Sequence, residues 1–188
     1  MNSERLKKQQ AQSTLLTIGI FSIIMLFAGL TSAYIVSKGS MGSQSDNIIL
    51  PDVFYLSTGA IIISGFLGFF TIKYCKLNNY KIVSQLLLWT IIFGCVFCYF
   101  QFLGWEALIR DNKFLSGNNV ASSYIYVFTL MHVFHLIGGL FTLVIIYFKS
   151  LRKKYNDQNS HGLKLGIRFW HFLGFLWVYL FSFLLLIN

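Results

Sequence analysis

Long apolar runs without any charge alternate with short polar segments along this chain. Five runs contain no Asp, Glu, Lys or Arg, and they cover approximately residues 14–36, 53–72, 82–105, 120–148 and 169–187. Each has about the 20 residues with which an α-helix crosses the ~30 Å hydrocarbon core of a bilayer. Hydrocarbon cannot hydrogen-bond a bare backbone N–H or C=O, so each run must satisfy its backbone internally, as a helix does. The pattern predicts an all-α, polytopic membrane protein.

One helical bundle takes up nearly the whole chain. We expect a single five-transmembrane-helix domain over residues 14–188, with helices at approximately 14–36, 53–72, 82–105, 120–148 and 166–187. The segment 1–13 is polar and basic, and we expect it to fray or to lie at the cytoplasmic membrane surface. Its basic residues precede an apolar run, as in a signal peptide. That run is longer than a signal peptide's apolar region, so we expect it to remain as the first spanning helix.

Basic residues are distributed unevenly between the two predicted sides of the bundle. If the helices alternate in direction, 12 of the 15 Lys and Arg residues fall on one side: three before residue 14, three within 73–81 and six within 149–168. Positive residues mark the cytoplasmic side, so we predict that the N-terminus lies inside and the C-terminus outside. The net charge of +9 then reflects topology and attraction to anionic headgroups, and we expect no nucleic-acid partner.

Motifs typical of soluble enzymes are missing from the sequence. It contains no Gly-rich phosphate loop, no paired carboxylates, no Ser/His/Asp arrangement and no zinc signature. Cys95 and Cys98 have half of a zinc-site spacing without a second pair. Thiols within a helix usually behave as small apolar side chains. We therefore predict no catalytic, cofactor-binding or metal-binding residue in this chain.

Four polar side chains, besides small hydroxyls, fall within the predicted spanning helices. They are Gln101, His132, His135 and His171. Intramembrane polar residues are costly and are therefore candidates for function. No Asp, Glu or Lys accompanies these four, which argues against a transporter or a proton pump. We expect them to form a hydrogen-bonded structural core, with Gln101, near the outer end of its helix, either capping a carbonyl or contacting a neighbour.

The heights of the histidines argue against a shared metal or haem. His135 lies 14 residues before Lys149, or about 21 Å, whereas His171 lies three residues after Arg168, or about 5 Å. The two sites then differ in depth by roughly 15 Å at 1.5 Å per residue. Ligands of one metal ion lie only about 2 Å from it. A bis-histidine haem would also need facing ligands at similar height.

Small residues and tryptophans suggest how the helices pack. Small residues four apart predict close helix approach, and they occur at Ala28 and Ser32, Gly29 and Ala33, Ser64 and Gly68, and Gly138 and Thr142. Trp105 and Trp170, near the ends of apolar runs, are expected to anchor the membrane interfaces. Trp89 and Trp177 lie deeper, and we expect them inside the bundle or against a partner.

Three stretches together resemble subunit III of the haem–copper oxidases. Residues 131–139 (MHVFHLIGG) resemble the family's F-H-G-L-H-V-x-x-G helix, and residues 169–177 (FWHFLGFLW) are similar to its Y-W-H-F-V-D-V-V-W helix. Gly94 with Gln101 seven residues on, followed by Trp105-Glu106, resembles a third motif. The likeness keeps its order from about residue 14 to residue 188, and five helices fit the short bacterial form.

The resemblance implies a non-catalytic subunit III of a proton-pumping terminal oxidase. We expect a cytochrome c oxidase, with a quinol oxidase as the alternative. The chain would pack on subunit I among other oxidase subunits that hold the haem and copper, and would span the bacterial inner membrane several times. Bound phospholipid is expected too. Lys149 matches a family arginine that meets a lipid phosphate, and we expect Lys149 and Arg168 to contact headgroups.

Two positions depart from the family pattern. Ile23 stands where the family often carries a membrane-embedded Glu, and Gly174 replaces the Asp of the W-H-F-V-D motif. Any proton-relay or O2-gating role that depends on these acids is therefore in doubt, which favours a structural role. Two other classes stay open: a small haem-binding membrane cytochrome, and an unrelated membrane transporter or assembly factor.

Overall fold

A computed structural model describes residues 2–41, 51–77, 79–110, 120–152 and 160–187. The helices are α1 (Asn2–Met41), α2 (Val53–Lys76), α3 (Tyr80–Arg110), α4 (Val120–Leu151) and α5 (His161–Ile187). All five are long and apolar enough to cross a membrane, and the described residues contain no strand. The predicted class, an all-α membrane protein with five spanning helices, is confirmed.

Several helices extend beyond the predicted bounds. Helix α1 begins at Asn2, so the described part of the 1–13 segment continues the first helix instead of lying apart from it. At 40 residues, α1 is about 60 Å long, twice the thickness of the hydrocarbon core. Helix α3 continues past residue 105 to Arg110, whose side chain pairs with Glu106 at 2.6 Å on the exposed surface.

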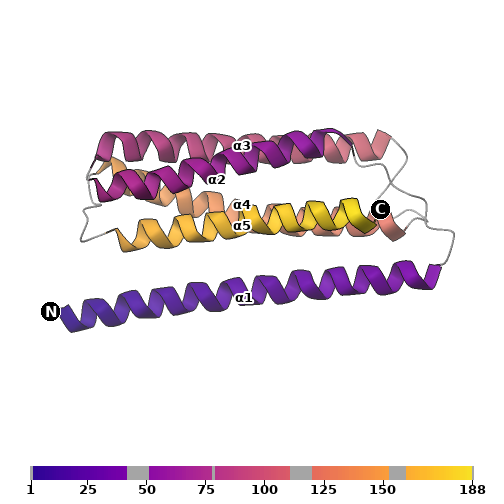
Figure 1. Cartoon of the computed structure of the whole chain (residues 1–188), viewed down its shortest axis with the longest axis horizontal. Coiled ribbons are helices and arrows are strands. Elements are labelled where there is room, and N and C mark those ends of the chain that lie inside the picture. The colour runs from indigo at the N-terminus through magenta and orange to yellow at the C-terminus, as the bar shows by residue number, and fades with distance from the viewer. Residues whose placement is uncertain (1, 42–50, 78, 111–119, 153–159, 188) are drawn as a thin grey trace.

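Helices α2 and α3 form the most closely packed pair, and Figure 1 shows them side by side. The buried residues of α3 alternate at spacings of four and three: Val83, Leu87, Thr90, Gly94, Phe97, Gln101, Gly104 and Leu108. Such a repeat keeps one stripe of a helix facing its partner, as in left-handed helix pairs. Gly104 lies in this stripe, where an added Cβ would come within 2.8 Å of the Phe54 ring on α2.

Helices α4 and α5 pack on this pair, and α1 lies along the outside of the bundle (Figure 1). Helix α1 packs on α4 and α5, and only 17% of its most apolar stretch is buried, against 39% in α4 and in α5. Its main attachment is aromatic: the Tyr34 ring contacts the rings of Tyr124, Phe128 and Phe183 at 5.2–6.2 Å.

Only part of the small-residue prediction agrees with this packing. Ser64 and Gly68 are buried in α2. In contrast, Ala28, Gly29, Ser32 and Ala33 are exposed on α1, and Gly138 is exposed on α4. Gly29 and Gly138 have no neighbouring atom within 4 Å of an added Cβ. The spacing alone cannot distinguish a face that meets another helix from one that leaves the bundle.

The tryptophans correct a second prediction. Trp170 is not an interface anchor: it is 1% exposed, and its indole N–H donates to Ser64 at 2.9 Å. Trp177 is buried within the bundle as expected, whereas Trp89 lies on the outer surface. Trp105 is partly buried and donates to Thr129 on α4. Each indole N–H that faces into the bundle meets a neighbouring hydroxyl, as an apolar surrounding requires.

Candidate functional site

Gln101 joins α3 to α2 inside the bundle. It is fully buried, and its amide nitrogen donates to the Ser57 hydroxyl at 3.0 Å, while Ser57 donates to the Phe54 carbonyl. Gln101 therefore contacts a neighbouring helix, which is one of the two roles expected for it. Its carbonyl oxygen has no hydrogen-bond partner among the described residues. A buried acceptor without a donor is uncommon and costs free energy.

His132 lies in an aromatic cage formed by three other helices. Its imidazole ring is 5.2 Å from Trp177, 5.9 Å from Phe97 and 6.5 Å from Phe27, measured between ring centroids. The side chain is fully buried, and neither ring nitrogen has a hydrogen-bond partner among the described residues. The expectation of a hydrogen-bonded histidine therefore does not hold for His132. Aromatic packing surrounds it instead.

His135 lies one turn further along α4 and is only half-buried. Its Nδ1 lies 2.6 Å from the Met131 carbonyl of its own helix, and its ring packs on Phe27 at 5.9 Å. Phe27 thus touches both histidines and ties this part of α4 to α1. The two imidazoles lie on neighbouring turns, and the rings that contact them belong to Phe and Trp residues.

A second polar cluster joins α2, α3 and α5. Ser64 accepts from the Trp170 indole at 2.9 Å and donates to the Thr90 carbonyl at 2.9 Å, so one hydroxyl connects three helices. One residue on, His171 places Nε2 at 2.9 Å from the Gly65 carbonyl and Nδ1 at 2.8 Å from the Ile167 carbonyl. A neutral imidazole has one N–H, so it donates only one of these two bonds at a time.

The histidines belong to separate sites. His171 lies six residues, about 9 Å, along α5 from Trp177, which packs on His132. Distances counted along the helices from Lys149 and Arg168 predict about 15 Å between the depths of His135 and His171, and one turn more for His132. Both values are too large, because Lys149 and Arg168 do not mark one level. Helix α4 ends two residues after Lys149, whereas α5 begins seven residues before Arg168. Among the described residues, no three His, Cys, Asp or Glu gather where they could hold a metal ion.

Lys149 and Arg168 are both exposed near the end of the bundle where α4 ends and α5 begins. Neither has a side-chain hydrogen bond or ion pair within the described part of the chain. Their side chains are therefore available to a headgroup. The two positions at which the resemblance predicts an acid are half-buried: Ile23 packs against the core, and Gly174 lies against Ile61 of α2.

Sequence reasoning missed the hydroxyls that bind the tryptophans and Gln101. Ser57 and Ser64 both carry interhelical hydrogen bonds, and Thr58 accepts from the Trp177 indole at 3.0 Å. A signal was present: Ser57, Ser64 and Thr71 recur every seven residues along α2. A heptad of small polar residues in an apolar helix is typical of an interface that uses hydrogen bonds.

The comparison with known families agrees with this arrangement. A family model described as "Cytochrome c oxidase subunit III" matches residues 52–187, which contain α2 to α5. The chain belongs to the cytochrome c oxidase subunit III family. The resemblance seen in the three motifs is confirmed, and the matched region begins just after α1.

Curated relatives carry the same name. "Cytochrome c oxidase subunit 3" of Chondrus crispus is 27% identical over 142 residues, which are 72% of this chain and 48% of that protein. The proteins of the same name from Alkalihalophilus pseudofirmus and Bacillus sp. (strain PS3) are 20% identical over 84% of this chain and are covered over 78% and 77% of their own lengths. The chain thus spans about half the length of the Chondrus protein and most of the two bacterial ones.

Proposed function

We propose that this chain is the non-catalytic subunit III of a proton-pumping haem–copper terminal oxidase that takes electrons from cytochrome c. It packs on subunit I, which with other oxidase subunits holds the haem and copper, and it stabilises the complex. Family membership over α2 to α5 is the observation that carries the proposal. The chain spans the bacterial inner membrane with its N-terminus inside, the orientation that the basic residues favour.

The environment of the histidines supports a role without a cofactor. His132 is enclosed by three aromatic rings, and both ring nitrogens of His171 lie within 2.9 Å of backbone carbonyls. His135 has Nδ1 against the Met131 carbonyl. A haem or metal would need such nitrogens to converge from different helices on one point. Here they point into separate contacts, so we place the redox centres in the partner subunits.

The first experiment is purification in mild detergent followed by identification of the co-eluting chains. We expect the chain to co-elute with a larger haem-bearing membrane protein, and its isolated form to show no Soret band. The variant His135→Gln should leave the visible spectrum of the complex unchanged. Stoichiometric haem in the isolated chain, or a haem feature lost in that variant, would assign the chain to the small membrane cytochromes instead.

Phospholipid binding is a further part of the proposal. Lys149 lies exposed in the last turn of α4, where an ammonium can meet a lipid phosphate as a point charge. Lys149→Ala should lower the anionic phospholipid that the purified complex retains, measured by mass spectrometry. Arg110→Ala, at the opposite end of α3 from Tyr80, is the control. Equal retention in the two variants would remove Lys149 from the lipid site.

A further inference from the structure

The surface between α2 and α5 contains an apolar groove of about 540 Å³. Phenylalanines form its walls: Phe66, Phe69 and Phe70 on α2 and Phe175 on α5, all of them exposed. Its floor is Gly65 and Gly174, where missing side chains leave room. The polar groups that border it, His171 and Trp170, already have partners in Gly65 and Ser64. An apolar ligand therefore fits here better than a polar one.

This groove covers only part of the membrane. From Ile61 to Phe70 it follows ten residues of α2, whose nine steps span about 13 Å, close to the thickness of one leaflet. Further toward the C-terminal end of α5 the groove ends, and the Tyr55 ring of α2 packs edge-on against the Phe181 ring of α5 at 5.0 Å. A spanning helix of a partner protein would need a groove along the whole thickness. A lipid of one leaflet needs only this half.

The α2 wall and the α5 wall of the groove both carry basic residues at the same end of the bundle. On α2, Phe66, Phe69 and Lys73 follow at spacings of three and four, and on α5, Arg168, His171 and Phe175 do the same, so each set shares one helix face. The helices run in opposite directions, since Gly65 meets His171 while Gly68 lies against Ile167.

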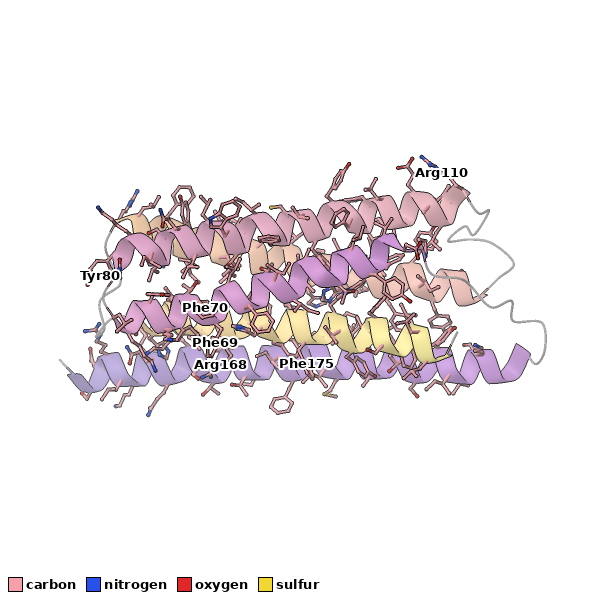
Figure 2. The ribbon with its side chains drawn as sticks, turned by 45° about the horizontal axis from the view of Figure 1, so that its top comes forward. Phe69, Phe70, Tyr80, Arg110, Arg168 and Phe175 are labelled. Atoms are coloured by element: carbon pink, nitrogen blue, oxygen red, sulfur yellow. The ribbon has the colours of Figure 1, made fainter. Side chains whose placement is uncertain are left out.

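The open end of the groove therefore carries only positive charge. Lys164, one turn before Arg168, adds a third cation, and neither α2 nor α5 contains Asp or Glu. In Figure 2, Arg168 lies beside Phe69 and Phe70, and Phe175 lies further along α5. Within the described residues, Lys73, Lys164 and Arg168 have no ion-pair partner. Long basic side chains can keep their stems on apolar surface and their charge at the interface.

From this geometry we propose that the α2–α5 groove binds an anionic phospholipid of the leaflet on the basic side. An acyl chain lies along the phenylalanine walls, and Lys73, Lys164 and Arg168 hold the phosphate. This site rests on and deepens the lipid binding proposed above, and it is distinct from the contact at Lys149. The half-depth of the groove and its one-sided charge identify the occupant.

The test uses the intact oxidase complex in mild detergent, titrated with phosphatidylglycerol or phosphatidylcholine and read by native mass spectrometry. Each cation near a headgroup contributes about fivefold in affinity. The variant Lys73→Gln with Arg168→Gln should therefore weaken phosphatidylglycerol binding by roughly 25-fold and reduce its preference over phosphatidylcholine by a similar factor, with Lys164 left as the remaining cation of the proposed site. Arg110→Gln, at the far end of α3, is the matched control and should change neither value.

A second variant fills the groove without touching its charges. Gly174→Leu should lower retention of both lipids several-fold, because the new side chain occupies the place of the acyl chain. The first carbon of that side chain meets only Ile61 at an ordinary 3.6 Å. Gly138→Leu, where nothing lies within 4 Å of an added Cβ, is the control and should leave retention unchanged.

Two results would overturn the groove assignment. One is unchanged phosphatidylglycerol binding in both groove variants. If Lys149→Ala still loses lipid in that case, the general lipid role stands and only the groove fails. The other is crosslinking to another protein chain from a photoreactive phenylalanine analogue at position 175, which would show that a subunit covers the groove. The proposal instead predicts crosslinks to phospholipid. Failure of co-purification would instead contradict the oxidase proposal itself.

Discussion

Helix α1 and the four helices after it are held by different kinds of contact. Hydrogen bonds of buried and partly buried side chains join α2, α3, α4 and α5, including Gln101 to Ser57, Trp170 to Ser64 and Trp105 to Thr129. Helix α1 has aromatic contacts through Phe27 and Tyr34, and hydrogen bonds near its ends, between Ser37 and Tyr124 and between the Gln9 carbonyl and His161.

This difference suggests that α2–α5 contribute most of the stability of the fold and α1 contributes little. In lipid no hydrophobic effect drives helices together, so packing and interhelical hydrogen bonds must fix their arrangement. Both are concentrated in the α2–α5 unit, which is also the part that the family model matches. Helix α1 leaves most of its apolar surface exposed. Substitutions should therefore be far more costly in the four-helix unit than in α1.

The largest effect is expected at Trp170. Trp170→Ala leaves a cavity and removes the indole donor to the Ser64 hydroxyl, which keeps its bond to the Thr90 carbonyl, so the free energy of unfolding should fall by about 3–5 kcal/mol. Trp89→Ala removes the same side chain from an outer surface, where it is 53% exposed, and should cost much less. Unfolding of the purified chain in mixed detergent and SDS measures both. Equal losses of unfolding free energy in the two variants would contradict the difference in burial between Trp170 and Trp89.

A glycine pair compares the two regions directly. An added Cβ at Gly94 would lie 2.7 Å from both Leu140 and the Trp170 ring, so Gly94→Ala should destabilise the fold by about 1–3 kcal/mol. Gly29 on α1 has nothing within 4 Å, and Gly29→Ala should be neutral or stabilise by up to about 1 kcal/mol through helix propensity. The same unfolding titration applies. A destabilised Gly29→Ala variant would mean that another helix packs against α1 at Gly29.

Substitution of two histidines tests how much hydrogen bonds contribute to the stability of the α2–α5 unit. His132→Phe removes two ring nitrogens that lack partners among the described residues, so stability should stay the same or rise by about 1 kcal/mol. His171→Phe loses a bond to the Gly65 carbonyl and should cost about 1 kcal/mol. Both are read from the same unfolding titration. A marked loss of stability in His132→Phe would reveal a polar partner for that ring.

The smallest effect is expected at the exposed end of α3. The Glu106–Arg110 pair is four residues apart on one helix, with side chains 56% and 77% exposed. Arg110→Ala should therefore change the free energy of unfolding by no more than about 0.5 kcal/mol, and the change should shrink as salt is added. A loss above about 1 kcal/mol that resists high salt would contradict a solvated pair.

The five helices could be predicted because an uncharged apolar run of about 20 residues is typical of a membrane-spanning helix. The helical start of α1 was also predictable, since Glu, Lys, Gln and Ala at residues 4–11 are strong helix formers. The polarity of residues 1–13 suggested a segment separate from the first helix. Polar residues with high helix propensity can nevertheless continue a helix outside the membrane.

The rotation of each helix could not be predicted in the same way. His132 and His135 are the same residue type on successive turns, yet one is fully buried and the other half-buried. Trp170, close to Arg168, has the sequence context of an interface anchor but faces Ser64. In a uniformly apolar helix the pattern of residues barely distinguishes lipid from protein, so the facing direction depends on contacts between segments far apart in the chain.

Ser57 and Ser64 lie seven residues apart on α2, and each forms a hydrogen bond with α3, Ser57 with Gln101 and Ser64 with the Thr90 carbonyl. These two bonds fix the rotation of α2 relative to α3. Inserting one residue between the two serines would turn one hydroxyl by about 100° relative to the other. Gln101 and Thr90 could then no longer both be reached from the same face of α2. The middle of this helix should consequently tolerate no change of length.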